Sequence, residues 1–190
     1  MKQLILASGS PRRRELMKMI GADFEVITSD CDERIDGDPA PSDLVGILAR
    51  RKAQAVSRQH PDAIVIGADT IVCLDGHILG KPRDRSDAIA TLLSLSGREH
   101  IVYTGLAVIG SDRAIVDVSA TRVAFVPLTR AECERYADTG EPMDKAGSYG
   151  IQGRGGMFVS RIDGDYFNVV GLPISRLRSI LADSFGIELL

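Results

Sequence analysis

Side chains that phosphate chemistry requires occur at several points in the chain. Asp69 stands inside the strongest strand-like run, residues 63–74, where aspartate is disfavoured and a buried carboxylate without partners is costly. We interpret it as a functional acid; the alternative is a carboxylate that bonds the backbone turn at Gly67. The candidate phosphate-binding cations are Arg12, Arg13, Lys52 and Lys81. Cations offset the charge on phosphate oxygens and a carboxylate orients or deprotonates water, so this set suits phosphoryl hydrolysis.

Residues 4–16 predict a strand, a tight turn and the start of a helix. Ser10 suits the N-cap of that helix and Pro11 its first position. Backbone N–H groups at a helix start favour an anion, and arginines just inside the helix add planar donors suited to phosphate. An ordinary strand-to-helix turn with solvated arginines is the alternative that this stretch alone leaves open.

Lys52 lies near the middle of an apolar stripe on the next predicted helix, about residues 43–58, with Ser42 as its cap. Because buried unpaired lysines are rare, we interpret Lys52 as a cation aimed into an anionic cleft. The alternative is an ammonium group that reaches past the edge of the core. No role is expected for the neighbouring Arg50 and Arg51, which we interpret as solvated surface charges.

Residues 29–41, the acidic loop, precede that helix. The carboxylates of the acidic loop are Asp30, Asp32, Glu33, Asp36 and Asp38. Most are expected to be solvated, and one or two are candidates for holding a divalent cation, which needs hard oxygen ligands.

Residues 144–156, the glycine-rich stretch, contain five glycines together with Gln152. Glycine lets the backbone approach a ligand closely, although a flexible surface loop is the more frequent meaning of such a composition. Earlier, a turn at Asp75 and Gly76 predicts a hairpin that would pair Lys81 with Thr70. Strict alternation then places Lys81 and Asp69 on opposite faces, unless a bulge intervenes.

The remaining pattern favours one α/β domain, residues 1–190, with a mixed sheet. The other expected elements are a helix from residue 84 or 86, strands at 101–109 and 114–126, a capped helix from 129, a hairpin at 158–170 and a helix opened by Pro173. The net charge of −3 gives no basic excess, so nucleic-acid binding is not suggested, and no window is apolar enough to span a membrane. Three well-separated cysteines indicate free thiols and a cytoplasmic protein, and the three histidines are expected at the surface or in turns.

Several ordered motifs support a resemblance that no single one would carry. They are LASGSPRRREL (6–16), ARRKA (49–53), GADTIV (67–72), GKP (80–82), SGREH-x-V-x-T (96–104), DKAGSYGIQGRGG (144–156) and NVVGLP (168–173). Together they resemble the Maf family of nucleoside triphosphate pyrophosphatases over nearly the whole chain. The resemblance implies an elongated, Maf/ITPase-like α/β fold, with a curved mixed β-sheet flanked by helices and two lobes around a cleft. Members are often dimeric, so a homodimer is among the states it implies.

The resemblance also implies roles for individual residues in cleavage between the α and β phosphates. Asp69 matches the water-activating carboxylate, and Glu33 matches an acidic position associated with metal and catalysis, so Glu33 and Asp69 are the expected ligands of Mg²⁺ or Mn²⁺. The residues that match substrate-binding positions are Ser8, Arg12, Arg13, Lys52, Thr70, Lys81 and Gln152.

The forms GADT and GIQG resemble the branch that acts on dTTP and UTP. The branch that acts on 7-methyl-GTP typically has Gln at the position of Thr70 and Glu at the position of Gln152. An amide such as that of Gln152 can both donate to and accept from the imide edge of a pyrimidine. Two alternatives stay open: the 7-methyl-GTP activity, and a regulator of cell division that uses nucleotide binding as a signal, as the family's septum-formation-inhibitor label suggests.

Overall fold

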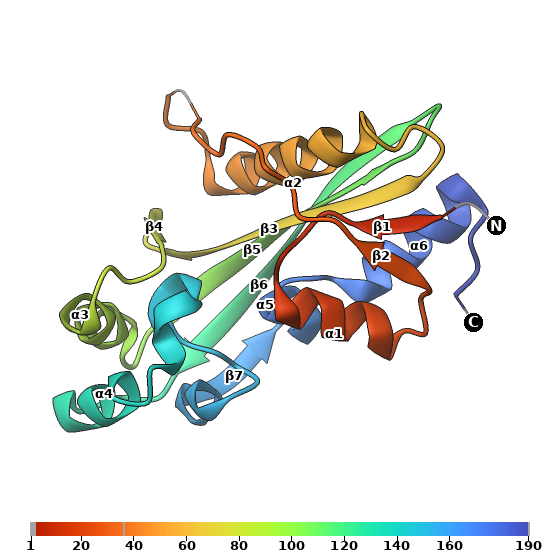
Figure 1. Ribbon diagram of the computed structural model, residues 1–190. Coiled ribbons are helices and arrows are strands. Elements are labelled where there is room, and N and C mark those ends of the chain that lie inside the picture. Colours follow the sequence, from red (N-terminus) through yellow and green to blue (C-terminus); the bar gives the residue numbers. More distant parts are fainter. Residues whose placement is uncertain (1–2, 36, 190) are drawn as a thin grey trace. The chain divides into compact units, whose positions relative to one another are not determined.

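The computed structural model describes residues 3–35 and 37–189 (Figure 1), so Asp36 of the acidic loop lies outside the described residues. The strands are β1 (Leu4–Leu6), β2 (Phe24–Val26), β3 (Ile64–Leu74), β4 (His77–Leu79), β5 (Glu99–Ile109), β6 (Ala114–Phe125) and β7 (Val159–Asp163). The α-helices are α1 (Pro11–Met19), α2 (Pro41–Ser57), α3 (Arg85–Leu95), α4 (Arg130–Ala137), α5 (Tyr166–Val170) and α6 (Ile174–Phe185). Three 3₁₀ turns are η1 (Glu141–Asp144), η2 (Ala146–Ser148) and η3 (Arg154–Phe158).

The described strands form a mixed seven-stranded sheet in the order β2-β1-β3-β5-β6-β7, with β4 paired to β3. The short strand β1 pairs in parallel with β2 on one side and with β3 on the other, where Leu6 lies opposite Val26 and Ile66. Strands β4 and β7 pair antiparallel with β3 and β6. The expected α/β fold with a mixed sheet and helices is therefore confirmed.

Contacts within the chain define two compact units. The first unit comprises the chain up to Asp69, Thr104–Ser119 and the chain from Gly171 onward, and the second comprises Thr70–Tyr103 and Ala120–Val170. The division falls inside β3, β5 and β6, and in β3 it falls between Asp69 and Thr70.

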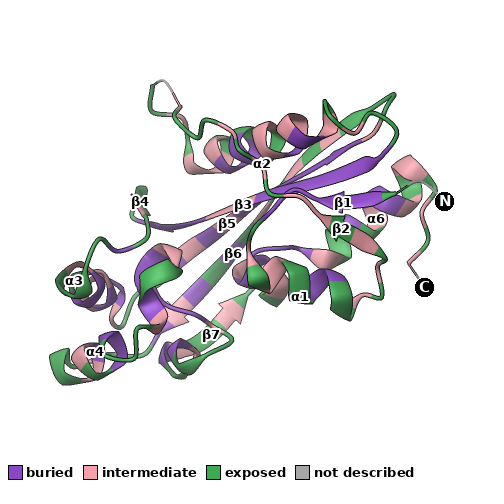
Figure 2. Ribbon diagram, in the orientation of Figure 1, coloured by how far each residue is buried: buried purple, intermediate pink, exposed green. Residues whose placement is uncertain are grey.

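The core of the first unit forms where α2 lies directly on the sheet. Strand β1 is buried along its length (Figure 2). A Cβ atom on Gly67 of β3 would lie 2.5 Å from the carbonyl oxygen of Ala49, and one on Gly105 of β5 would lie 2.1 Å from that of Val45. Only glycine permits so close an approach, so these two positions determine how near α2 comes to β3 and β5.

The core of the second unit is aromatic. His100 is buried there, with its ring centroid 5.0 Å from that of Phe125 and 5.4 Å from that of Tyr149, and its Nε2 lies 2.9 Å from the Tyr149 hydroxyl. Burial lowers the pKa of His100 to about 4. The prediction of a surface or turn position was therefore wrong for this histidine.

Two further expectations needed correction. Only the first arm of the hairpin predicted at residues 158–170 is a strand, because β7 pairs with β6 and the chain continues into α5. Asp165 accounts for the change: its backbone N–H donates to Thr121 Oγ1 and its carboxylate accepts the N–H of Phe167, which starts the helix. Helix α2 begins at Pro41 and not after Ser42, because proline suits the first helical position; Ala40 is the N-cap.

Candidate functional site

The turn after β1 is organised around the hydroxyl of Ser8. The backbone N–H of Ala7 donates to the carbonyl of Ile66 over 2.8 Å, which extends the pairing with β3 one residue beyond the end of β1. Ser8 is buried, and its Oγ accepts hydrogen bonds from the backbone N–H of Ser10 at 3.3 Å and from the Arg13 guanidinium at 3.2 Å. Ser10 occupies the predicted N-cap position of α1, but its side chain makes no capping hydrogen bond.

Arg13 links this turn to Gly171, which lies three residues before α6. Its Nε donates to the carbonyl oxygen of Gly171 over 2.8 Å, which together with the bond to Ser8 fixes the plane of the guanidinium. Burial lowers the pKa of Arg13, whereas the negative charge of Asp69, and to a smaller extent that of Glu33, raises it. The charged arginine therefore lies in the electrostatic field of both candidate acids.

Lys52 lies between two carboxylates. Its Nζ is 2.6 Å from Asp69 Oδ1 and 3.1 Å from Glu33 Oε1. The side chains of Lys52 and Asp69 are each 13% exposed, whereas that of Glu33 is 59% exposed. Lys52, in the apolar stripe of α2, thus contacts Asp69 of β3, because Gly67 allows α2 to lie close to that strand.

The strand order places these groups where open α/β sheets bind ligands. The chain passes from β1 to β2 on one side and returns to β3 on the other, so β1 is a topological switch point. Ligands of such sheets bind beyond the carboxyl ends of the strands at this point. Ser8 follows the carboxyl end of β1, and Asp69 lies three positions after Ile66, the partner of Leu6. Ser8 therefore lies at the carboxyl end that this rule selects, and Asp69 lies just past that level within β3, which continues to Leu74.

Arg51, to which the sequence assigned no role, contacts the acidic loop. Its Nη1 donates to the carbonyl oxygens of Arg34 at 2.6 Å and Asp32 at 3.2 Å, on either side of Glu33. A solvated arginine and an arginine that binds main-chain carbonyls look alike in sequence, so no signal in the pattern distinguishes them.

The predicted base-binding and remaining phosphate residues belong to the second unit. Thr70 is half-buried, and Lys81 and Gln152 are exposed. The β3–β4 ladder ends where Val72 lies opposite Leu79, so the predicted pairing of Lys81 with Thr70 does not form. The GKP segment is held differently, because the carbonyl of Gly80 accepts the N–H of Gly147 at 3.1 Å.

The glycine-rich stretch is folded into 3₁₀ turns around one carboxylate, that of Glu141. Glu141 accepts hydrogen bonds from the backbone N–H groups of Arg154 at 3.0 Å and Gly155 at 3.2 Å, and from the Tyr136 hydroxyl at 2.8 Å. Tyr136 in turn accepts the N–H of Gly150, and burial together with its bond to Glu141 raises its pKa. The stretch is therefore built of 3₁₀ turns with defined hydrogen bonds, although Gln152 and Arg154 are exposed at the surface.

The donor set of the site fits a divalent cation that binds together with a substrate. Glu33 and Asp69 offer hard carboxylate oxygens on either side of one ammonium group. Within residues 3–35 and 37–189, no three acidic, histidine or cysteine side chains are grouped so as to hold a metal alone. Mg²⁺ commonly takes one or two protein carboxylates and completes its shell with water and substrate phosphates, so two carboxylates suffice.

Comparison with known proteins decides the family. A family model described as Maf-like protein matches residues 3–184. The chain belongs to the Maf family. A Maf relative from Symbiobacterium thermophilum, named dTTP/UTP pyrophosphatase, is 52% identical over 186 residues, which cover 98% of this chain and 95% of the relative. A second one, with the same name, from Bacillus anthracis is 51% identical over 177 residues, 93% of each chain.

A solved structure is similar to this Maf chain in fold alone. It is a HAM1 protein from Coxiella burnetii, with a TM-score of 0.51 and 13% sequence identity over 97% of this chain and 100% of that one. No helix within the described residues of the Maf chain is long and apolar enough to cross a membrane.

Proposed function

We propose that this Maf chain hydrolyses dTTP and UTP to the nucleoside monophosphate and pyrophosphate. The observation that carries the proposal is the position of Lys52 between Asp69 and Glu33, in the electrostatic surroundings of Arg13. This arrangement combines an acid able to act on water with cations able to receive phosphate oxygens. The shared name of two relatives that are about half identical supports the choice of substrate.

Asp69 is the proposed catalytic residue. Its carboxylate accepts a proton from a water molecule, and the water oxygen forms a bond to the α-phosphorus. The bond between that phosphorus and the oxygen bridging to the β-phosphate breaks, and pyrophosphate leaves with the electron pair. The ammonium group of Lys52, 2.6 Å from Asp69 Oδ1, fixes the orientation of this carboxylate before the substrate arrives.

The phosphate groups are proposed to bind to Ser8, Arg12, Arg13, Lys52 and Lys81. The bonds of Arg13 to Ser8 and Gly171 hold its planar guanidinium in one orientation, which reduces the entropy lost when a phosphate binds. Glu33 and Asp69 are the proposed ligands of Mg²⁺ or Mn²⁺. When bound, such an ion offsets negative charge on the triphosphate oxygens.

Base selection is proposed to rest on Thr70 and Gln152. The exposed amide of Gln152 can donate to and accept from the imide edge of thymine or uracil. Glu141 supports this role, because its bonds to the N–H groups of Arg154 and Gly155 hold the chain just after Gln152.

We also propose that residues 1–190 act as one catalytic domain and assemble as a homodimer. The family match over residues 3–184 includes parts of both compact units, which supports a single functional domain. Sedimentation equilibrium across a range of protein concentrations tests the dimer, and a mass equal to one chain at all concentrations would reject it.

The experiment that tests the function is a panel of nucleoside triphosphates with Mg²⁺ or Mn²⁺. We expect dTTP and UTP to be the preferred substrates, with monophosphate and pyrophosphate as products. Preference for 7-methyl-GTP would overturn the choice of substrate. Release of inorganic phosphate with a nucleoside diphosphate would overturn the site of cleavage.

A further inference from the structure

The backbone around Glu33 is only partly fixed by contacts within its own segment. The residues on either side of it, from Ile27 to Ala40 except Asp36, form no helix or strand, and its side chain is 59% exposed. Its carboxylate nevertheless lies 3.1 Å from Lys52 Nζ, and a long flexible side chain in a loop loses entropy when it is held in one place. Within the loop, the Asp32 carboxylate accepts the backbone N–H of Arg34 at 2.9 Å, but this bond is exposed and does not tie the loop to the rest of the first unit. A contact from outside the loop is needed for that.

Arg51 makes that contact. Its Nη1 carries two N–H groups, and it donates to the carbonyl oxygen of Arg34 at 2.6 Å and to that of Asp32 at 3.2 Å. These carbonyls belong to the residues immediately before and after Glu33, so the guanidinium brackets that one position. Arg51 and Lys52 are neighbours on α2, and one side chain binds the backbone of the acidic loop while the other pairs with its carboxylate.

We propose that Arg51 is a positioning residue that clamps the acidic loop and so presents the Glu33 carboxylate beside Asp69 for a divalent cation. This inference rests on the proposed function for its catalytic consequence, but the clamp itself is a property of the protein without ligands. An ammonium group in place of the guanidinium keeps the charge but loses the fixed planar geometry, so Arg51→Lys retains part of the clamp and Arg51→Met none.

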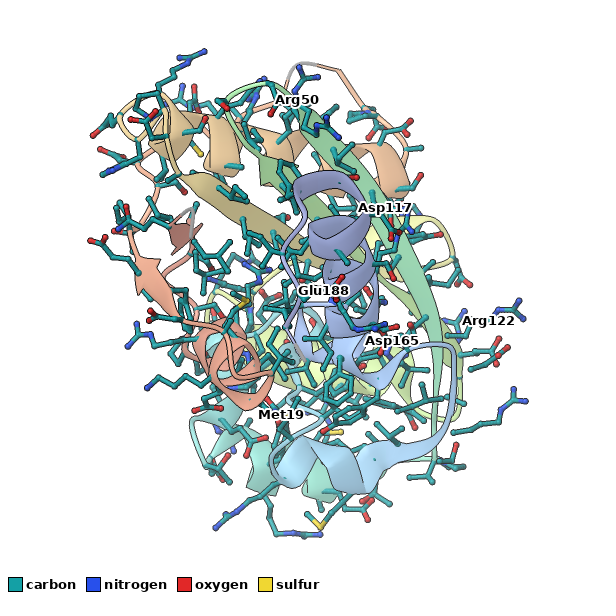
Figure 3. All side chains as sticks on the ribbon, turned by 90° about the vertical axis from the view of Figure 1, so that its right-hand side faces the viewer. Met19, Arg50, Asp117, Arg122, Asp165 and Glu188 are labelled. Carbon is teal, nitrogen blue, oxygen red and sulfur yellow. The ribbon has the colours of Figure 1, made fainter. Side chains whose placement is uncertain are left out.

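The chain contains a matched control in Arg50. It precedes Arg51 on α2 and is exposed at the surface (Figure 3). Arg50→Met removes the same charge and the same guanidinium from the same helix, while the bonds to Asp32 and Arg34 remain. A difference between the two variants therefore reports the clamp and not the net charge.

The first test uses Cys31, two residues before Glu33, as a reporter in the metal-free protein. Cys31 is half-buried whereas Cys73 and Cys133 are buried, and burial raises the pKa of Cys133, so a thiol reagent modifies Cys31 first. We expect Arg51→Met to speed the modification of Cys31 about threefold or more, because loss of the clamp opens the loop more often. Arg50→Met should match the unaltered protein. Equal rates in the two variants would overturn the clamp.

The second test is a double-mutant cycle between Arg51→Met and Glu33→Gln with dTTP and Mg²⁺. Arg51→Met alone should lower kcat/KM about tenfold and raise the Mg²⁺ concentration needed for half-maximal rate, with Arg51→Lys in between. In the Glu33→Gln background, Arg51→Met should lower kcat/KM by about twofold or less, because the clamp then has no carboxylate to position. Fully additive losses would overturn the inference and indicate direct contact with substrate.

If the unaltered protein releases no pyrophosphate from any triphosphate, the proposed function fails, and the rates of Cys31 modification still test the clamp.

Discussion

In the acidic loop and in the glycine-rich stretch, one charged side chain bonds two main-chain groups, but the direction of the hydrogen bonds is opposite. Arg51 donates to two main-chain carbonyls of the acidic loop, and Glu141 accepts from two main-chain N–H groups of the glycine-rich stretch. The bonds of Arg51 are exposed to water. Those of Glu141 are joined by a bond from Tyr136, whose hydroxyl also accepts the N–H of the buried Gly150.

Packing widens this difference. A Cβ atom on Gly153 would lie 2.4 Å from Glu141 Oε1, and one on Gly155 would lie 2.6 Å from the Tyr136 hydroxyl. The glycines of that stretch therefore make room for the carboxylate and phenol that hold it. The acidic loop has the exposed Arg51 contact instead, and exposed hydrogen bonds contribute less to stability than buried ones. The segment that carries Gln152 is therefore closely packed against the Glu141 and Tyr136 side chains, whereas the contacts of Arg51 to the segment that carries Glu33 are at the surface.

The largest effect on stability is expected when the Glu141 network is broken. In Glu141→Gln an amide N–H₂ group must face backbone N–H donors, so we expect the free energy of unfolding to fall by about 1–3 kcal/mol. Denaturation by urea, followed by circular dichroism, measures the change. Glu134→Gln is the control, since Glu134 pairs only loosely, at 3.6 Å, with the exposed Arg130 on the surface of α4. Equal losses in the two variants would contradict the inference that the hydrogen bonds of Glu141 stabilise the glycine-rich stretch.

A smaller effect is expected from acid, through His100 in the aromatic core of the second unit. Burial lowers the pKa of His100 from 6.5 to about 4, so below pH 6.5 the unfolded chain binds a proton that the folded chain excludes. Stability should therefore fall as the pH drops below 6.5, by about 1–2 kcal/mol at pH 5, and this histidine should have no such effect above pH 7. The urea midpoint measured between pH 7.5 and 5 tests this. An unchanged pH dependence in His100→Gln would show that another group is responsible.

The smallest effect is expected at Arg14, which is exposed on α1 beside the half-buried Arg13. We expect Arg14→Ala to change kcat/KM for dTTP by about twofold or less, because a solvated side chain contributes little. Arg13→Ala, which removes the donor to Ser8 and Gly171, is the comparison, and it should lower kcat/KM far more than Arg14→Ala does. A large loss in Arg14→Ala would mean that the turn after β1 binds phosphate through a different arginine.

The parts of the fold and site that sequence could predict are those set by local pattern. Asp69 is a charged residue in an otherwise apolar strand, Lys52 is a charged residue in the apolar stripe of a helix, and the two are in contact. The capped helix predicted from residue 129 formed, and its cap is a capping box between Thr129 and Glu132, which depends on residues three apart. These inferences needed no knowledge of distant segments.

The features that sequence missed depend on partners far along the chain. Arg51 binds carbonyl oxygens 17 and 19 positions away, and main-chain acceptors leave no trace in residue types. Strand β7 pairs with β6, more than thirty positions earlier, so the local hairpin was the wrong expectation. His100 is buried by Phe125 and Tyr149, which no short window of sequence connects to it.

The proposed role of Asp69 is to act on water and not mainly to bind nucleotide. Asp69→Asn tests it most directly, with hydrolysis of dTTP and affinity for a non-hydrolysable dTTP analogue measured on the same protein. We predict that hydrolysis falls about a thousandfold, because the amide cannot accept the proton, while affinity stays within about threefold. Hydrolysis that stays within about tenfold of the unaltered protein, or a loss explained by weaker binding alone, would contradict the account.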